Sequence, residues 1–295
     1  MKSYAGLSVR ESLKASMEHG AGLDNRCWDE LLNAPLPAVL VMSPFRRDVV
    51  GRLTGKQVHI LGPFIHYANP AMNEEETEAQ RRRLGRMLLA FPVHSSHNIT
   101  FEYSVDRFCR NLERLGKGFD SIVVNVYWKD VLLGKADEYT RRGFEVVSCG
   151  HMFDLDFLSR LKTLINLASL TVSNSMTTAL GYSLHLGIPH VYLPELLGIW
   201  ADTPETYARE FTSYHSPRSF DFDTFEKAFG DSEAGITPAQ LSIARRYWGF
   251  GRELSSTDLA GLFNAIERDW ERMHRSPSSA PIGQGRAYSS PGGTT

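Results

Sequence analysis

The chain has 295 residues, 42% of them hydrophobic and 22% charged, so it is long and apolar enough to bury a substantial core. Its 32 Lys and Arg residues against 34 Asp and Glu residues give a net charge of −2, with no basic excess for binding nucleic acid. The apolar runs are shorter than a membrane span and no signal-peptide pattern follows Met1, so we expect neither a transmembrane segment nor a signal peptide, and three widely spaced cysteines exclude a disulfide framework. We therefore expect a cytoplasmic α/β or α+β protein from a reducing compartment.

The first 86 residues contain few regular elements. Residues 1–37 are predicted to be irregular, and 38–42 and 57–61 are apolar runs bounded by turn residues, which is typical of buried strands. Residues 73–86 are highly charged, and the acidic residues precede the basic ones. This order suits a helix dipole, so the segment predicts a solvated helix.

From residue 87 the chain alternates regularly between strand-like and helix-like segments. The predicted strands are 87–93, 120–128, 144–148, 170–173 and 189–193, and the predicted helices between them are 104–116, 130–142, 154–168 and 176–186. Five strands alternating with helices predict an α/β fold, a doubly wound parallel sheet of the Rossmann-like kind with helices on both faces.

The pattern weakens after residue 194. Residues 198–235 are predicted as loops with a short helix near 222–229, and two amphipathic helices are predicted over 237–249 and 255–274. Thr237 followed by Pro238 is typical of a helix start. Residues 276–295 are rich in Ser, Pro and Gly and are expected to form a disordered tail.

Polar residues follow the predicted strands at their carboxyl ends, where ligands bind in an open parallel sheet. Such residues are small hydroxyls, imidazoles, an amide, one Lys and one Glu: His94, Ser95, Ser96, Lys129, His151, Ser173, Asn174, Ser175, Thr177, Thr178 and Glu195. Because these ends meet at one edge of the sheet, we expect the side chains to converge on a single site.

The turn over 173–178 is the most distinctive of these segments. It is rich in hydrogen-bonding side chains and leads into a helix, so it predicts a phosphate site made of hydroxyls and free backbone N–H groups. The alternative is an ordinary strand–helix turn with Ser as the N-cap. His94 and His151 could contact phosphate or transfer a proton, or could only fix their loops. Asp154 is expected to cap the next helix, and Arg160 to lie on its surface.

Several familiar motifs are absent from the sequence. There is no G-x-G-x-x-G, no P-loop and no G-x-S-x-G, which weighs against nicotinamide enzymes, P-loop NTPases and α/β-hydrolases. His94 and His97 lie three residues apart, but metal-ligand spacing is otherwise missing. We therefore expect no metal and no cofactor.

Taken together, these motifs resemble the nucleotide-binding half of a GT-B glycosyltransferase. The resemblance rests on the order of a His94-Ser95 turn, a Trp-Lys-Asp turn, a Gly-His turn, the 173–178 turn with its helix and Gly187-Ile188-Pro189, and a final Pro-Glu turn. It spans about residues 38–275 and is similar to the branch that builds bacterial capsule and lipopolysaccharide, including sialyltransferase-like and polysialyltransferase-like enzymes.

The resemblance implies a domain division and a set of roles. Residues 1–84 would be a truncated acceptor-side remnant and linker, 85–275 the nucleotide-sugar-binding domain with C-terminal helices, and 276–295 the tail. The polar turns would hold the nucleotide-activated sugar without a metal. Glu18-His19-Gly20 resembles the His-Gly at the end of an acceptor domain, so His19 is the local candidate for the catalytic base.

The resemblance predicts transfer of a sugar from a nucleotide-activated donor to a glycan or lipid-linked acceptor in bacterial surface polysaccharide or lipopolysaccharide synthesis. The site of action would be the cytoplasm or the inner face of the membrane. Related enzymes carry a Glu five residues before the Gly of the Gly-x-Pro turn, where this chain has Tyr182. Two alternatives stay open: a nucleotide-sugar 2-epimerase-like isomerase, and a non-catalytic half-transferase completed by a second chain.

Overall fold

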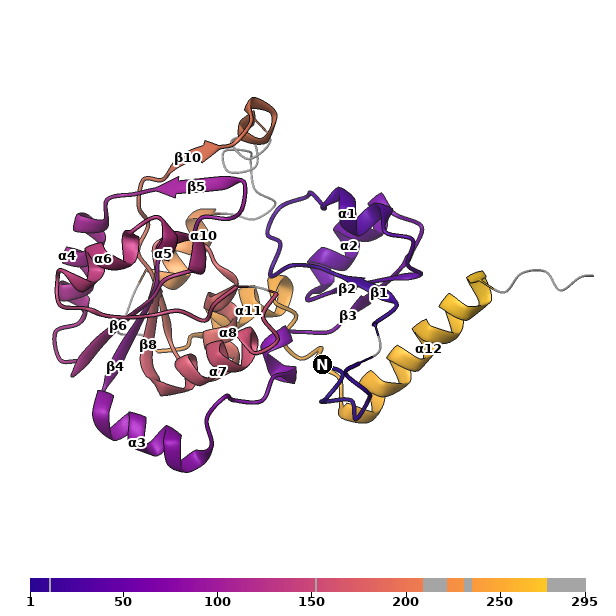
Figure 1. Ribbon diagram of the computed structural model, residues 1–295, viewed down its shortest axis with the longest axis horizontal. Helices are drawn as coiled ribbons and strands as arrows, with labels where there is room; N and C mark the ends of the chain where they lie inside the picture. The colour runs from indigo at the N-terminus through magenta and orange to yellow at the C-terminus, as the bar shows by residue number, and fades with distance from the viewer. Residues whose placement is uncertain (11, 152, 209–221, 231–234, 275–295) are drawn as a thin grey trace, which may run out of the picture.

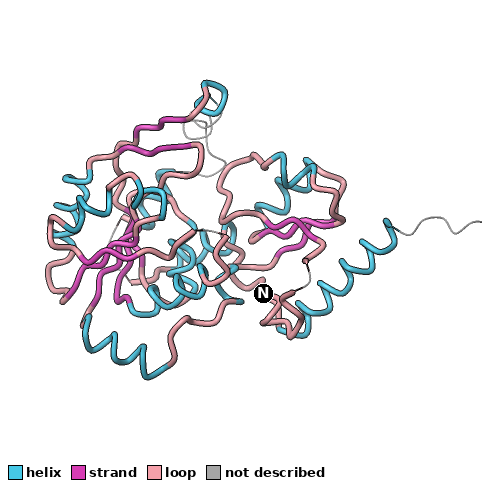
Figure 2. Tube along the Cα trace, viewed as in Figure 1, coloured by secondary structure: helices cyan, strands magenta, loops and turns pink. Residues whose placement is uncertain are grey.

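A computed structural model describes residues 1–10, 12–151, 153–208, 222–230 and 235–274. It contains a five-stranded sheet, a three-stranded sheet and a two-stranded sheet with helices packed around them (Figures 1 and 2). The expected tail over 276–295 and part of the segment predicted as loops over 198–235 lie outside the described residues.

The five-stranded sheet has the order β7 (Glu145–Val147), β6 (Ser121–Asn125), β4 (Met87–Phe91), β8 (Ala168–Ser173), β9 (His190–Tyr192). Every neighbouring pair is parallel. The predicted α/β fold with a parallel, doubly wound sheet is therefore confirmed, and all five predicted strands are present in it.

Helices cover both faces of this sheet because β4 is apolar in every position. Its alternate residues point to opposite faces: Leu88 and Ala90 pack with α4 (Val105–Leu115), whereas Met87 and Leu89 pack with α7 (Phe157–Leu167) and α8 (Thr178–His185). The helix expected over 130–142 is instead two short helices, α5 (Trp128–Leu132) and α6 (Lys135–Thr140). Gly134, with φ of 80°, separates them.

The N-terminal part of the chain forms a separate parallel sheet of β1 (Ala15–Met17), β2 (Ala38–Val41) and β3 (Gln57–Ile60). It is accompanied by α1 (Asp29–Asn33) and α2 (Pro44–Leu53). The sequence predicts β2 and β3 but takes residues 1–37 as irregular, which is wrong. Three residues are too few to show strand periodicity, so β1 is recognisable only by its pairing with β2.

The helix α2 also escaped sequence prediction, although its start carries a signal. Ser43 caps it by accepting a hydrogen bond from the N–H of Arg46, and Pro44 occupies the first helical position. The sequence pattern places Ser43 and Pro44 in the turn that ends the apolar run 38–42, and not at the start of a helix. A two-stranded antiparallel sheet of β5 (Ile99–Glu102) and β10 (Gly198–Ala201) was missed as well, because its partners lie about a hundred residues apart.

The two parallel sheets are joined by the segment between β3 and β4 and by the chain after β9. The joining segments are η1 (Phe64–Tyr67), α3 (Glu74–Leu84), α10 (Phe222–Phe229), α11 (Pro238–Tyr247) and α12 (Ser256–His274). Thr237 and Gln240 form a capping box on α11, as the Thr-Pro signal predicts. Trp248 is fully buried, and its indole N–H donates to the carbonyl of Thr178. Gly249 lies directly against the carbonyl of Met42 at the end of β2, so one turn contacts both sheets.

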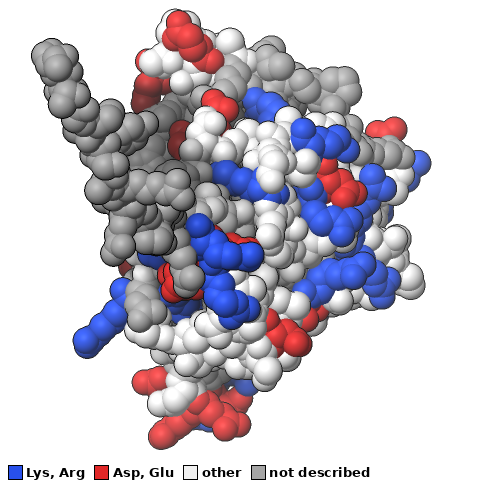
Figure 3. Space-filling view, turned by 90° about the vertical axis from the view of Figure 1, so that its right-hand side faces the viewer, with Lys and Arg blue, Asp and Glu red and all other residues white. Residues whose placement is uncertain are grey.

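The surface is unevenly charged despite the small net charge. On the face shown in Figure 3, Lys and Arg side chains dominate the middle, whereas Asp and Glu gather towards the lower edge. None of the described helices combines the length and the apolar character that crossing a bilayer requires.

Candidate functional site

The carboxyl ends of the two parallel sheets meet at the loop that follows β1. This loop contains Glu18, His19 and Gly20, and the N–H of Ala21 donates to the Oγ1 of Thr178 over 3.0 Å. Thr178 stands at the start of α8, directly after the turn that follows β8. Gly20 has φ of 74°, and a Cβ there would lie 2.6 Å from that same hydroxyl. The close approach of the two sheets therefore requires glycine.

His19 and His94 lie near each other at the junction between the carboxyl ends of the two sheets, and we call this junction the recess. Both imidazoles reach solvent, yet protein surrounds them closely enough for desolvation to lower both pKa values. The proximity of His94 lowers the pKa of His19 further. The Nδ1 of His94 lies 3.2 Å from the carbonyl of Ser95, which can only accept a hydrogen bond. His94 Nδ1 therefore carries the hydrogen in the neutral ring, and its Nε2 holds a lone pair.

The turn over 173–178 divides into a buried half and an accessible half. Ser173 is buried, donates to the carbonyl of Ser175 over 2.7 Å and lies 2.9 Å from the Nε2 of His190. The Oδ1 of Asn174 accepts from the N–H of Val93 over 2.6 Å, so this residue ties the turn to the end of β4. The hydroxyl of Ser173 is thus committed to holding the turn, against the expectation that it faces a ligand, whereas the buried Nδ2 of Asn174 has no hydrogen-bond partner within the described residues.

The accessible half of that turn consists of Ser175, Thr177 and Thr178, which are half-buried. Thr177 is the N-cap of α8 and accepts from the N–H of Ala179. Because the first N–H groups of a helix have no intrahelical partners, this end can bind an anion. The predicted phosphate site therefore has a geometric basis at these three residues.

Ser95 also proves to be an internal residue. It is fully buried, and both its N–H and its hydroxyl donate to the carboxylate of Asp130 over 2.8 and 2.7 Å. Lys135 donates to the same carboxylate over 2.7 Å and completes the cluster. The hydroxyl of Ser95 therefore stabilises the loop after β4 and does not face the recess. Ser96 next to it is half-buried, and its N–H donates to the carbonyl of Ile99.

A line of aromatic and imidazole rings runs outward from His94 along the same sheet edge. His94 lies 4.5 Å from Tyr127 between ring centroids, and Trp128 follows at 6.0 Å from Tyr127. Trp128 is 5.3 Å from His97 and 4.9 Å from His151, both measured between ring centroids. Phe153 extends the line, with its centroid 5.1 Å from that of His151. We call these six rings the ring cluster.

Besides His94, two of the predicted site residues, His151 and Lys129, lie in or beside the ring cluster. The Nδ1 of His151 accepts from the N–H of Phe153, so its Nε2–H faces the Nε2 of His97 at 3.3 Å. Lys129 donates to the carbonyl of His97 over 2.7 Å. The imidazole pair is thus His97 with His151, and not His94 with His97. Within the described parts of the chain no three His, Cys, Asp or Glu residues are grouped as metal ligands.

Glu195 is directed towards α4 instead of the recess. Its side chain is 2% exposed, with Oε1 3.2 Å from Asn111 Nδ2 and Oε2 3.5 Å from Arg107 Nε. Burial raises the pKa of this carboxyl, and Arg107 opposes the shift. The expected helix cap at Asp154 is also different, because Asp154 instead accepts from the N–H of Asp156 ahead of α7 and from Arg160.

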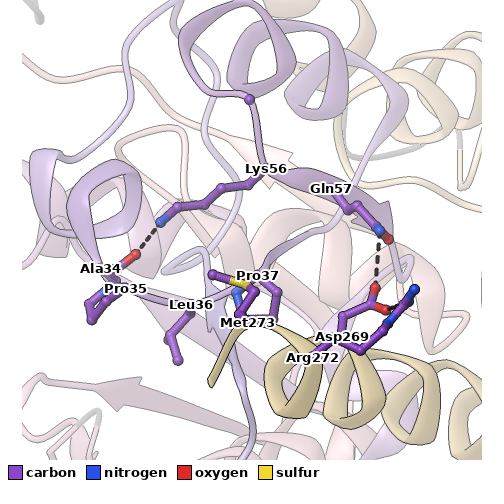
Figure 4. Close-up of a pocket in the computed structure, with 10 residues that line it drawn as sticks. Ala34, Pro35, Leu36, Pro37, Lys56, Gln57, Asp269, Arg272 and Met273 are labelled. Carbon is purple, nitrogen blue, oxygen red and sulfur yellow. Dashed lines mark hydrogen bonds and ion pairs between the residues drawn. The ribbon is translucent and has the colours of Figure 1, made fainter. Parts of the chain in front are cut away.

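A surface groove of about 710 Å³ lies elsewhere, between the beginnings of β2 and β3 and the end of α12 (Figure 4). Lys56 donates to the carbonyl of Ala34 there, and Gln57 donates to Asp269. This groove is at the amino ends of the strands. Because parallel sheets bind ligands at their carboxyl ends, we place the candidate site at the recess of His19 and His94.

Sequence reasoning missed several residues that build this site. Tyr127 lies just after β6, which ends at Asn125, but the sequence pattern places it inside the predicted strand 120–128 and gives it no role. Trp128 and Asp130 belong to the Trp-Lys-Asp turn of the sequence analysis, but the bond of Asp130 to Ser95, and the role of Lys135 beside it, depend on contacts across the sheet edge that the pattern does not show.

Comparisons with known proteins add information about the fold. No family model matches the sequence, and no curated protein does. Among solved structures, a histidine-to-alanine variant of the wall teichoic acid polymerase TagF matches with a TM-score of 0.50 and 10% identity, over 88% of this chain and 69% of that one.

Two further structures match at lower TM-scores. The UDP-GlcNAc 2-epimerase of Methanocaldococcus jannaschii, in complex with UDP-GlcNAc and UDP, has a TM-score of 0.42 and 12% identity, over 83% of this chain and 68% of that one. The pneumococcal O-GlcNAc transferase GtfA, in complex with UDP and GlcNAc, has a TM-score of 0.36 and 12% identity, over 88% and 51%. At such identities the likeness to TagF shows the fold alone: a Rossmann-like α/β architecture shared with this polymerase.

Proposed function

We propose that this protein transfers a glycosyl group from a nucleotide-activated sugar to an acceptor hydroxyl. The observation that carries the proposal is the recess in which His19, from the carboxyl edge of one parallel sheet, lies near His94, from that of the other. The start of α8 lies at the same junction. Such a recess offers a proton acceptor beside an anion site.

The phosphate of the donor would lie at the start of α8. Ser175 and Thr177 supply hydroxyls there, and the helix dipole supplies a partial positive charge. A phosphate beside His94 favours the charged imidazolium. The Nε2 of His94 therefore takes up a proton when the sugar donor binds, and the Nε2–H donates a hydrogen bond to the phosphate. One such fixed donor is commonly worth about 10²–10³ in rate. Ser96 and Thr178 are further candidates for contacts to the donor.

The base of the nucleotide would stack on the ring cluster. Trp128 is partly exposed, and Phe153 is 75% exposed, so a ring face is open to solvent. Stacking on aromatic side chains is worth about 1–3 kcal/mol per base and tolerates different bases. Lys129 adds a positive charge beside this surface.

His19 would act as the general base. Its lowered pKa keeps the imidazole neutral near pH 7, so it can accept a proton. As the acceptor oxygen bonds to the anomeric carbon, its proton passes to His19, and the bond to the leaving phosphate breaks with its electron pair on the phosphate oxygen. The bound nucleotide then leaves as the second product. No metal and no cofactor take part in this scheme.

We further propose that the acceptor is a glycan or a lipid-linked glycan of a bacterial surface polysaccharide or lipopolysaccharide, made at the cytoplasmic side of the inner membrane. The wall teichoic acid polymerase with the same fold builds a cell-surface polymer, as its name states, and this supports the choice. The described cysteines, Cys27, Cys109 and Cys149, are all unpaired, which suits a reducing compartment.

The test begins with a thermal-shift screen of UDP, CMP, GDP and CDP, followed by calorimetry of the nucleotide that stabilises the protein. The substitution His94→Ala removes one hydrogen bond to a charged group, worth about 1.5–3 kcal/mol, so affinity should fall about 10–100-fold. The control His274→Ala lies at the exposed end of α12 and should have no effect. Failure of all four nucleotides to bind, or an unchanged affinity in His94→Ala, would refute the proposal.

Products distinguish the function from its rivals. Conversion of the nucleotide sugar without any acceptor would indicate an epimerase. Binding without turnover, together with a stable complex with another chain by mass measurement, would indicate a half-transferase.

A further inference from the structure

Arg46 is buried at the joint between the loop after β1 and the first turn of α2. Its side chain is 2% exposed, although arginine is seldom buried without partners. The guanidinium donates from Nε to the Oε1 of Glu18 over 2.8 Å. It also donates from Nη1 to the carbonyl of Asp24 and from Nη2 to the carbonyl of Arg26, both over 2.6 Å. One side chain therefore holds residues 18, 24 and 26 together.

The local sequence explains why Arg46 reaches this loop. The capped start of α2 places Arg46 in its first turn, and helix side chains lean towards the N-terminus, here towards the carboxyl edge of the small sheet. A Cβ on Gly22 would lie 2.6 Å from the Nε of Arg46. The absence of a side chain at Gly22 allows the loop to wrap closely around the guanidinium.

The arrangement is poorly suited to a purely stabilising role. Burying an ion pair costs desolvation that its attraction only partly repays, and apolar pairs of similar volume are often as stable. The second carboxylate oxygen of Glu18, Oε2, has no hydrogen-bond partner within the described residues. Burial raises the pKa of Glu18, and Arg46 opposes the shift. The planar guanidinium does, however, donate to three acceptors at once, and this fixes the orientation of the loop that carries them.

We infer that Arg46, together with Glu18, is a positioning pair that fixes the loop carrying His19 in the recess. His19 directly follows Glu18, and Ala21 bonds to Thr178 on the other side of the recess. The loop is therefore held at both walls. This inference rests on the proposed role of His19 as the base, and it assigns a task to a residue that contacts neither donor nor acceptor.

The test uses Arg46→Lys, which keeps the charge and the ion pair but loses the fork that binds two carbonyls. Its matched control is Arg47→Lys, the adjacent arginine, which is half-exposed and paired with Asp48. Three quantities are measured: the pKa of the His19 ring by NMR of histidine-labelled protein, donor affinity by calorimetry, and kcat as a function of pH.

In Arg46→Lys the released loop hydrates His19, so its pKa should rise towards about 6.5, and the acid limb of the pH–rate profile should move up with it. Misplacement of the base by about 1 Å should lower kcat about 10²-fold. Donor affinity should not change, because the donor contacts lie on the large sheet. The Arg47→Lys control should match the wild type in all three measurements.

A second variant provides the same test if Arg46→Lys does not fold. Glu18→Leu combined with Arg46→Met fills the same volume with apolar side chains and should release the loop with the same rise in the pKa of His19. An unchanged pKa of His19 and an unchanged kcat in whichever variant folds would overturn the inference. If the pKa of His19 shifts in the variant while the wild type itself shows no glycosyl transfer, the positioning role is supported and the proposed function is overturned instead.

Discussion

Replacing Gly20 by alanine should loosen the joint between the two parallel sheets. The added Cβ would lie 2.6 Å from the hydroxyl of Thr178, and the φ of 74° is unfavourable for any residue with a Cβ. The left-handed conformation costs about 1–2 kcal/mol. Thr178 must also turn away, which breaks the hydrogen bond from Ala21 and costs about 0.5–1.5 kcal/mol. The expected loss in the free energy of unfolding is thus about 1.5–3.5 kcal/mol.

The assay is urea unfolding followed by tryptophan fluorescence, with linear extrapolation to water. The matched control is Gly51→Ala in α2, where an added Cβ has nothing within 4 Å. Alanine has the higher helix propensity, so this control should be stabilised by up to about 1 kcal/mol. The same chemical change should therefore have opposite signs at the two positions.

A double-mutant cycle identifies the cause of the loss. Thr178→Val removes the hydroxyl and should cost about 1 kcal/mol alone. Gly20→Ala should then cost less in the Thr178→Val background, because the hydrogen bond is already gone. Equal costs of Gly20→Ala in both backgrounds, or a Gly20→Ala protein as stable as the wild type, would refute the described contact between the sheets.

Four other outcomes are expected. His190 is buried with its pKa lowered to about 3, so the unfolded chain binds the extra proton; this residue should contribute about 2 kcal/mol to the loss of stability from pH 7 to pH 5, and the loss in His190→Gln should be smaller by that amount in urea titrations at both pH values. Trp248→Ala should cost about 3–5 kcal/mol in the same assay, because the ring is fully buried. Ser95→Ala leaves Asp130 short of a donor and should cost about 1–3 kcal/mol, with nucleotide affinity by calorimetry unchanged. The acid limb of the rate of glycosyl transfer should have its midpoint below pH 6.5, because desolvation lowers the pKa of His19; a fall centred above pH 6.5 would contradict its role.

Sequence reasoning located the elements that have strong local patterns. The five strands of the large sheet alternate with helices and are rich in apolar residues, most completely in β4, which is apolar and buried in every position. The start of α11 was also predicted correctly, because the capping signal of Thr237 and Pro238 depends only on residues adjacent in the sequence. Elements with weak periodicity were missed: β1 has three residues, and β5 pairs with a strand about a hundred residues away.

The candidate site shows the same division between local and long-range information. The amino-acid sequence by itself determined that hydroxyls and imidazoles follow parallel strands and so gather at one edge. Only the tertiary structure decided that Ser95 and Ser173 face inward while His94 faces the recess, because that choice depends on partners such as Asp130 and His190 from other segments. The resemblance named His19 as the candidate base, and the tertiary structure placed it at this edge through the contact of its loop with Thr178. Spacing along the chain records where a side chain stands on its own element, whereas burial and pairing depend on what packs against it.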